Sequence, residues 1–138
     1  MKLFIDANIL VCVFNKEYPE FPYASRVLSL ADNKKYKLVT SSICLAIAFY
    51  FAEKKHGDAI AKGKINLLLK HIDIVDCGKN EAVLASGNKK IHDFEDGLQY
   101  YAAVNSKCQC IITNDTGDFY FSDIEVLQPE TFLRKYFS

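Results

Sequence analysis

Residues 2–8 read Lys-Leu-Phe-Ile-Asp-Ala-Asn, and this stretch decides the fold. Residues 3–5 are a short apolar run with an aromatic and a β-branched side chain, which predicts a buried strand. Asp6 ends the run, and a carboxylate at the carboxyl end of a buried strand lies where open α/β sheets bind their ligands. Asp6 and Asn8 are also favoured N-cap residues for a helix over residues 9–14, so capping alone is the alternative interpretation.

Apolar segments with the spacing of strands and helices alternate along the rest of the chain. This order predicts an α/β fold with three layers, α/β/α, around a mostly parallel central sheet of about five strands. The strands are expected at residues 3–5, 36–39, 72–75, 110–113 and 125–127. The helices are expected at residues 9–14, 23–32, 43–55, 59–70, 80–86, 94–105 and 130–136, the last preceded by Pro129 at its first position. The helix over residues 43–55 is apolar on almost every side up to Glu53, which predicts burial over most of its length.

The composition excludes several classes of protein. Seventeen basic and 17 acidic side chains balance, which excludes a strongly basic coat protein and leaves nucleic-acid contacts to local patches. The five cysteines and three histidines lack the spacing of a zinc site, and an odd number of cysteines favours reduced thiols in a cytoplasm. Asp6 and Asn8 interrupt the only early apolar run, so no signal peptide is expected. No uninterrupted apolar stretch approaches transmembrane length, so no membrane span is expected. The length suits one domain over residues 1–138.

Acidic side chains stand at three places that a parallel sheet would bring to one edge. They are Asp6 after the first strand, Asp115 and Asp118 after the fourth strand, and Asp93, Glu95 and Asp96 at the start of the helix before the fourth strand. Carboxylates brought together raise one another's pKa unless a cation lies between them, and oxygen ligands favour magnesium or manganese. Each cluster also has a structural interpretation, because acids stabilise helix starts and are common in turns. Their joint placement favours a metal site.

Several runs together resemble the PIN domain, the nuclease domain of many bacterial toxins of the VapC type. The runs are residues 4–10, 39–43, 93–100, 111–119 and 127–133, so the resemblance spans nearly the whole chain. It implies a PIN-like fold and a metal-dependent endoribonuclease that cleaves RNA phosphodiester bonds with Mg²⁺ or Mn²⁺. It also implies a small antitoxin protein and a second copy of the chain as partners.

The resemblance assigns roles residue by residue. The catalytic and metal-binding carboxylates are Asp6, Asp96 and Asp118, with Asp115 as a further metal ligand. The supporting residues are Asn8, Thr113 and Glu95. The substrate phosphates need cations, and the best local candidates for binding them are Lys89, Lys90 and His92, just before Asp93. A solvated loop is the alternative interpretation of these three residues.

One position departs from the family pattern. Many PIN nucleases carry a glutamate a turn into the central helix, and that position is Ile47 here. Glu53 lies six residues further, well off the same helix face. Two hypotheses follow: an active metal-dependent endoribonuclease, or a catalytically degenerate PIN-like module that binds RNA or a protein partner.

Overall fold

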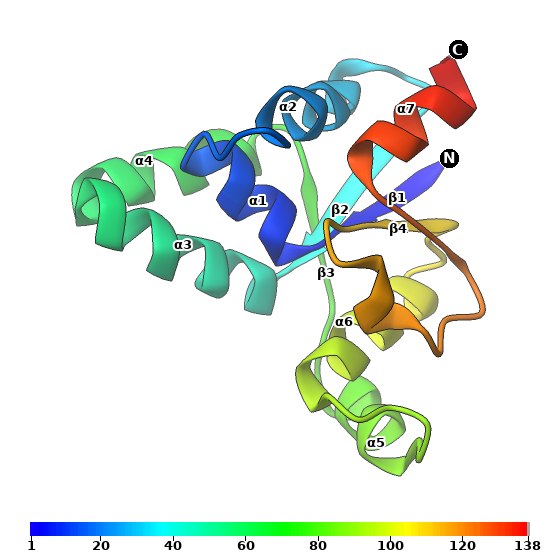
Figure 1. Cartoon of the computed structure of the whole chain (residues 1–138). Helices are drawn as coiled ribbons and strands as arrows, with labels where there is room; N and C mark the ends of the chain where they lie inside the picture. Colours follow the sequence, from blue (N-terminus) through cyan, green and yellow to red (C-terminus); the bar gives the residue numbers. More distant parts are fainter. Residues whose placement is uncertain (138) are drawn as a thin grey trace.

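The computed structural model describes residues 1–137 and contains a five-stranded parallel sheet (Figure 1). The strands are β1 (Lys2–Ile5), β2 (Lys37–Ser41), β3 (Asp73–Val75), β4 (Cys110–Ile112) and β5 (Glu125–Leu127). The helices are α1 (Ala7–Phe14), α2 (Phe21–Ser29), α3 (Ser42–His56), α4 (Asp58–Leu69), α5 (Lys79–Gly87), α6 (Phe94–Asn105) and α7 (Pro129–Phe137), with short 3-10 helices η1 (Leu30–Asp32) and η2 (Thr116–Phe119). The order of strands across the sheet is β3-β2-β1-β4-β5.

β1 is the central strand. Leu3 pairs with Leu38 of β2 on one side and with Cys110 of β4 on the other. Leu3, Phe4 and Ile5 are fully buried, which agrees with a parallel strand covered on both faces. The apolar run that opens the chain therefore lies at the centre of the core.

Helices cover both faces of the sheet, as expected from the sequence. α1, α2 and α7 lie on one side of the sheet, and α5 and α6 lie on the other (Figure 1). Phe132 of α7 and Val27 of α2 are buried on the first side, and Ala102 and Ala103 of α6 are buried on the second. The predicted α/β/α arrangement is confirmed, and the sheet is parallel throughout.

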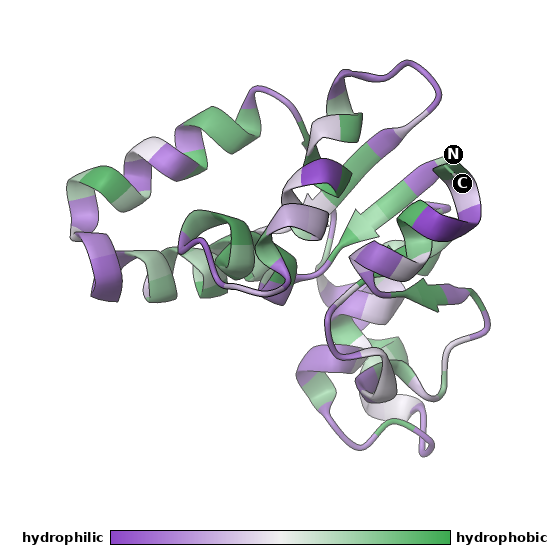
Figure 2. Ribbon diagram, turned by 45° about the horizontal axis from the view of Figure 1, so that its top comes forward, coloured by the Kyte–Doolittle hydropathy of each residue, from purple (hydrophilic) through white to green (hydrophobic). Residues whose placement is uncertain are grey.

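The expectation that the helix over residues 43–55 is buried for most of its length is wrong. Only Cys44, Ala48 and Ala52 of α3 are buried, whereas Tyr50 and Phe51 are 53% and 45% exposed. α3 and α4 form a hairpin that projects beyond the sheet (Figure 1). α3 packs mainly on α1 and α4, with a smaller contact to β2, which leaves part of its surface to solvent. Figure 2 shows hydrophobic residues along both helices of this hairpin.

Element boundaries differ from the expectations by two residues or fewer, except that the helix expected to reach residue 32 ends at Ser29 and continues as η1. β2 continues to Ser41, whose hydroxyl accepts a hydrogen bond from the backbone N of Cys44 at 3.2 Å and caps α3. α2 begins at Phe21, earlier than expected, because Pro22 fits in the first turn of a helix, where its missing N–H has no partner to lose. The five cysteines are free thiols. No helix within residues 1–137 has the length and apolar character needed to cross a membrane.

Candidate functional site

The crevice between the ends of β1 and β4 is the topological switch point of the sheet. From β1 the chain moves outward to β2 and β3, then crosses back to β4 and β5 on the other side. The segments that leave β1 and β4 therefore diverge, and open α/β sheets bind ligands at the carboxyl ends of such strands. The backbone N of Asp6 donates to the carbonyl of Ile112 at 3.0 Å, which holds the two strand ends together.

Asp6 both caps a helix and faces this crevice. Its Oδ1 accepts from the backbone N of Ala7 at 2.8 Å, and Asp6 is the N-cap of α1. Its Oδ2 accepts from the Thr113 hydroxyl at 2.9 Å. The two interpretations of Asp6 are thus compatible, because each carboxylate oxygen has a separate partner.

Thr113 is the centre of the hydrogen bonds that fix this crevice. Its fully buried side chain donates to Asp6 and accepts from Asn8 Nδ2 at 3.0 Å and from the backbone N of Asp115 at 3.1 Å. Asn8 adds bonds from its Nδ2 to Asp115 Oδ2 at 3.2 Å and from the backbone N of Asn114 to its Oδ1 at 3.0 Å. These bonds set the direction of the Asp6 carboxylate and of the turn after β4.

Asp96 joins this group from the other face of the sheet. It lies in the first turn of α6, where its backbone N donates to Oδ1 of the N-cap Asp93 at 3.2 Å. Burial and the negative charges of Asp93, Asp118, Asp6 and Glu95 raise the pKa of Asp96 to about 7. Repulsion between Asp96, Asp6 and Asp118 means that residues far apart in the sequence share one electrostatic environment.

The remaining carboxylates complete the cluster. Burial raises the pKa of Asp6 to about 6. The hydrogen bonds from Thr113 and Ala7 oppose this shift, and the charges of Asp115 and Asp118 act in the same direction as burial. Asp118 lies in η2 and is exposed, and its pKa is raised by partial burial and by the charges of Asp115 and Asp93. We call Asp6, Asp96, Asp115 and Asp118 the acidic cluster.

The donors of the acidic cluster suit a hard divalent cation, but they do not form a ready-made cage. No three His, Cys, Asp or Glu side chains within residues 1–137 lie close enough together to hold a metal ion directly. No ion pair in the same part of the chain involves the acidic cluster, so its charges have no cation from the protein. Mg²⁺ retains several waters and needs few direct protein ligands, so oxygen donors at this wider spacing are compatible with it.

The other residues expected at the site are exposed, except Ile47. Glu95 is exposed beside Asp96, and Lys89, Lys90 and His92 are exposed on the loop between α5 and α6. Ile47 of α3 is partly buried and packs against the core.

Two contacts near the site had no signal in the sequence analysis. Buried Gln99, one turn after Asp96, accepts from the Ser41 hydroxyl at 2.7 Å and links α6 to the end of β2. Tyr120 bonds to the loop before Asp93 through its hydroxyl, 2.5 Å from the carbonyl O of Lys90. Gln99 shares a helix face with Asp96 through its spacing of three, whereas nothing in the sequence pairs residue 120 with residue 90.

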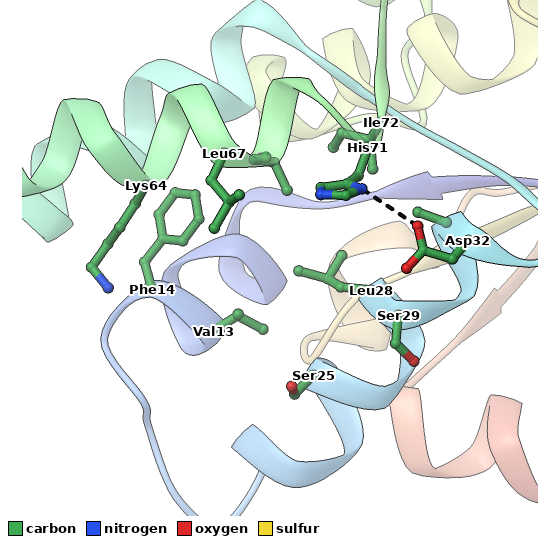
Figure 3. A pocket seen from close by; sticks show the side chains of 12 residues that line it. Val13, Phe14, Ser25, Leu28, Ser29, Asp32, Lys64, Leu67, His71 and Ile72 are labelled. Atoms are coloured by element: carbon green, nitrogen blue, oxygen red, sulfur yellow. Dashed lines mark ion pairs between the residues drawn. The ribbon is translucent and has the colours of Figure 1, made fainter.

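A second concave feature lies away from the acidic cluster, between α1, α2 and α4 (Figure 3). This apolar groove has a volume of about 310 Å³. Its lining includes Val13, Phe14, Leu28, Leu67, Leu68 and Ile72. Lys64 lies at one end, and His71 Nδ1 lies 3.4 Å from Asp32 Oδ1 at the other.

Fold and site together define an α/β/α protein with an acidic crevice at the switch point of its parallel sheet. The chain belongs to the PIN domain family, whose sequence profile matches residues 2–117. It is 32% identical to ribonuclease VapC1 of Aquifex aeolicus (strain VF5) over 142 aligned residues, which cover 98% of this chain and 95% of that protein. The resemblance stated from the sequence is confirmed.

Solved structures share the fold. The chain is similar to VapBC2 from Rickettsia felis bound to a promoter DNA fragment, with a TM-score of 0.71, 21% identity, and coverage of 93% of this chain and 98% of that chain. It is also similar to VapBC-1 from nontypeable Haemophilus influenzae, with a TM-score of 0.69, 21% identity, and coverage of 94% and 99%.

Proposed function

We propose that this protein is a PIN-type endoribonuclease that acts as the toxin of a toxin–antitoxin pair and requires Mg²⁺ or Mn²⁺. The observation that carries the proposal is the acidic cluster at the switch point, with two carboxylates whose pKa values are raised to about 6 and about 7. Carboxylates with raised pKa values that lie together at a switch point are typical of functional sites. The similarity to a VapC ribonuclease over almost the full length of both chains supports RNA as the substrate.

In the proposed mechanism Asp6, Asp96, Asp115 and Asp118 would together hold a hydrated cation. When bound, the cation polarises the scissile phosphate and lowers the pKa of the attacking water. Thr113 keeps the Asp6 carboxylate in one orientation, and Asn8 holds the turn that carries Asp115. Because their pKa values are raised to about 6 and about 7, Asp6 and Asp96 would become better ligands as the pH rises through this range.

RNA cleavage tests this proposal directly. The wild-type protein is expected to cleave RNA with Mg²⁺ or Mn²⁺ and to stop when the ions are chelated. The double variant Asp6→Asn, Asp96→Asn is expected to lose at least 100-fold in rate, on the order of the loss seen when one group that stabilises a transition state is removed. Asp73→Asn, an exposed acid at the start of β3, is the matched control. Full activity in the double variant would show that the proposed site is wrong.

The second candidate is a PIN-like module that binds RNA or a protein without cleaving. Ile47 favours it, because a carboxylate at that position would add an oxygen donor that this chain lacks. Calorimetric titration separates the two candidates. Binding of Mn²⁺ at or below millimolar concentrations supports the nuclease, and no binding in that range supports the module.

We further propose that a small antitoxin protein binds the apolar groove between α1, α2 and α4 (Figure 3). Leu67 is 59% exposed at this groove. Exposed apolar patches of this kind are typical of protein-binding surfaces. The expected partner co-purifies stoichiometrically and inhibits RNA cleavage. Leu67→Lys is expected to release it, while Lys62→Ala on the same helix does not. A second copy of the chain is the alternative occupant, and sedimentation of the purified chain distinguishes it.

A further inference from the structure

The loop between α5 and α6 is fixed to the segment that follows the acidic turn. The Tyr120 hydroxyl donates to the carbonyl O of Lys90 at 2.5 Å and accepts from the backbone N of His92 at 3.3 Å. Under this loop, Ile91 packs closely against Gly97 of α6. The loop therefore has a defined position at the rim of the acidic cluster.

His92 and Tyr120 form an aromatic stack that is open to solvent. Their ring centroids are 5.8 Å apart and their planes make an angle of 28°. Tyr120 is 58% exposed, and His92 is exposed as well. Burial therefore does not account for the stack, and both rings present surface to solvent.

The stack is anchored in the core. Phe121 meets the Tyr120 ring edge to face, with centroids 5.2 Å apart, and meets Tyr100 in the same way at 5.1 Å. Tyr100 is buried and its hydroxyl accepts from the backbone N of Asp123 at 3.1 Å. A ring held by such a series loses little conformational entropy when a ligand binds to it.

We propose that the His92–Tyr120 stack binds one unpaired base of a single-stranded RNA, beside the phosphate that lies at the acidic cluster. His92 directly precedes the N-cap Asp93 of α6, and Tyr120 follows Asp118 by two residues, so the stack borders the site on the side of both acids. Proteins recognise single-stranded RNA by stacking its bases on aromatic side chains. This inference rests on the proposed function and adds the contact that selects an unpaired base.

Two lysines on the loop favour a nucleic acid over a protein at this stack. Lys89 and Lys90 are exposed on the same loop, three and two residues before His92, and would contact the phosphates that flank a bound base. Neither lysine takes part in an ion pair within residues 1–137. The apolar groove between α1, α2 and α4 has the opposite character and is the better surface for a protein partner.

Binding of single-stranded RNA oligonucleotides in the presence of a chelator tests the stack without cleavage. His92→Ala and Tyr120→Leu are each expected to weaken binding by about tenfold, within the range for loss of one base stack. His92→Phe keeps an aromatic ring and is expected to bind like the wild type. Tyr136→Leu, an exposed tyrosine near the opposite end of the sheet, is the control. Thermal unfolding of each variant checks that the fold is intact.

Abasic substitutions placed in turn along the oligonucleotide identify the stacked base. One position is expected to cost the wild type about tenfold and to cost His92→Ala nothing further, because the same contact is already lost. If the loss from each abasic position adds in full to the loss from His92→Ala, the inference is overturned. It is also overturned if His92→Phe binds RNA as weakly as His92→Ala. Unchanged binding in all variants would assign the stack to a protein contact instead. If the wild type cleaves no RNA, the proposed function fails, while these binding results still decide the stack.

Discussion

The smallest unit that explains the site is the Asp6 carboxylate, which caps α1 through one oxygen and meets Thr113 through the other. Because its folded-state pKa is about 6, against an ordinary value of 3.8, the folded chain binds more protons than the unfolded chain between these values. Stability therefore falls as pH rises through this window, and the penalty is complete above about pH 6. The acidic cluster is a cost to folding that a bound cation would offset.

Asp6→Asn is expected to stabilise the metal-free protein at pH 8 by about 1–3 kcal/mol and to leave it nearly unchanged at pH 4. Asparagine is as good an N-cap as aspartate, so the loss of charge dominates the effect. Urea unfolding at both pH values, with a chelator present, measures the difference. Equal stability of the variant and the wild type at pH 8 would contradict the idea that the cluster is destabilising without a cation.

Thr113→Val removes a buried hydroxyl and keeps the shape of the side chain. The backbone N of Asp115 and Asn8 Nδ2 lose an acceptor, and Asp6 loses a donor. We expect a loss of about 1–3 kcal/mol in unfolding free energy, together with weaker Mn²⁺ binding. Thr131→Val on the exposed side of α7 should change stability by less than about 0.5 kcal/mol. A Thr113 variant that unfolds like the control would remove Thr113 from the centre of the site.

Among the elements, those marked by a local signal, such as an apolar run or an N-cap, could be predicted from the sequence. The central strand β1 and the capped helix α6 were predicted because a short apolar run and an N-cap with acids in the first turn are local signals. The exposure of α3 could not be predicted, since an apolar pattern does not say which neighbours a helix will have. The hairpin that α3 forms with α4 leaves one side of it uncovered.

For the site too, part of the arrangement could be predicted from the sequence and part could not. That Asp6, Asp96 and Asp118 would share one environment followed from the parallel sheet, because its strands end, and the helix before a strand begins, at one edge. The stack of His92 on Tyr120 joins residues 28 positions apart through loops, whose course has no periodicity to read. The spacing of the carboxylates also depends on tertiary packing, and they lie further apart than a metal cage requires.

The contact between α5 and α6 depends on the absence of a side chain at Gly97. A Cβ there would lie 3.0 Å from Ala85 Cβ and 3.0 Å from Ile91 Cγ2. Gly97→Ala is expected to destabilise the protein by about 1–3 kcal/mol, because overpacking exceeds the gain in helix propensity. Gly63→Ala in α4, where a Cβ would meet nothing within 4 Å, is expected to stabilise it by about 0.5–1 kcal/mol. Chemical unfolding of both variants checks these signs, and a stabilised Gly97 variant would show that Ile91 moves freely.

On the scale of the whole molecule, charge is balanced at 17 basic and 17 acidic side chains. RNA binding therefore cannot rely on a general positive field, and we expect the few cations near the acidic cluster to supply the phosphate contacts. The loop before α6 offers Lys89 and Lys90. A second pair of adjacent lysines, Lys34 and Lys35, precedes β2, at the amino ends of the strands and therefore opposite the acidic cluster.

This arrangement predicts a shallow dependence of RNA affinity on salt. Two lysine contacts with a single strand correspond to a slope of about −1.4 in log K against log salt concentration, since each contributes about −0.7. The double variant Lys89→Ala, Lys90→Ala is expected to lose about this amount of slope, whereas Lys34→Ala, Lys35→Ala keeps the wild-type slope. Fluorescence anisotropy with a labelled oligonucleotide and a chelator, from 50 to about 300 mM salt, measures both. A larger loss in the Lys34, Lys35 variant would mean that RNA follows the opposite edge of the sheet, away from the acidic cluster.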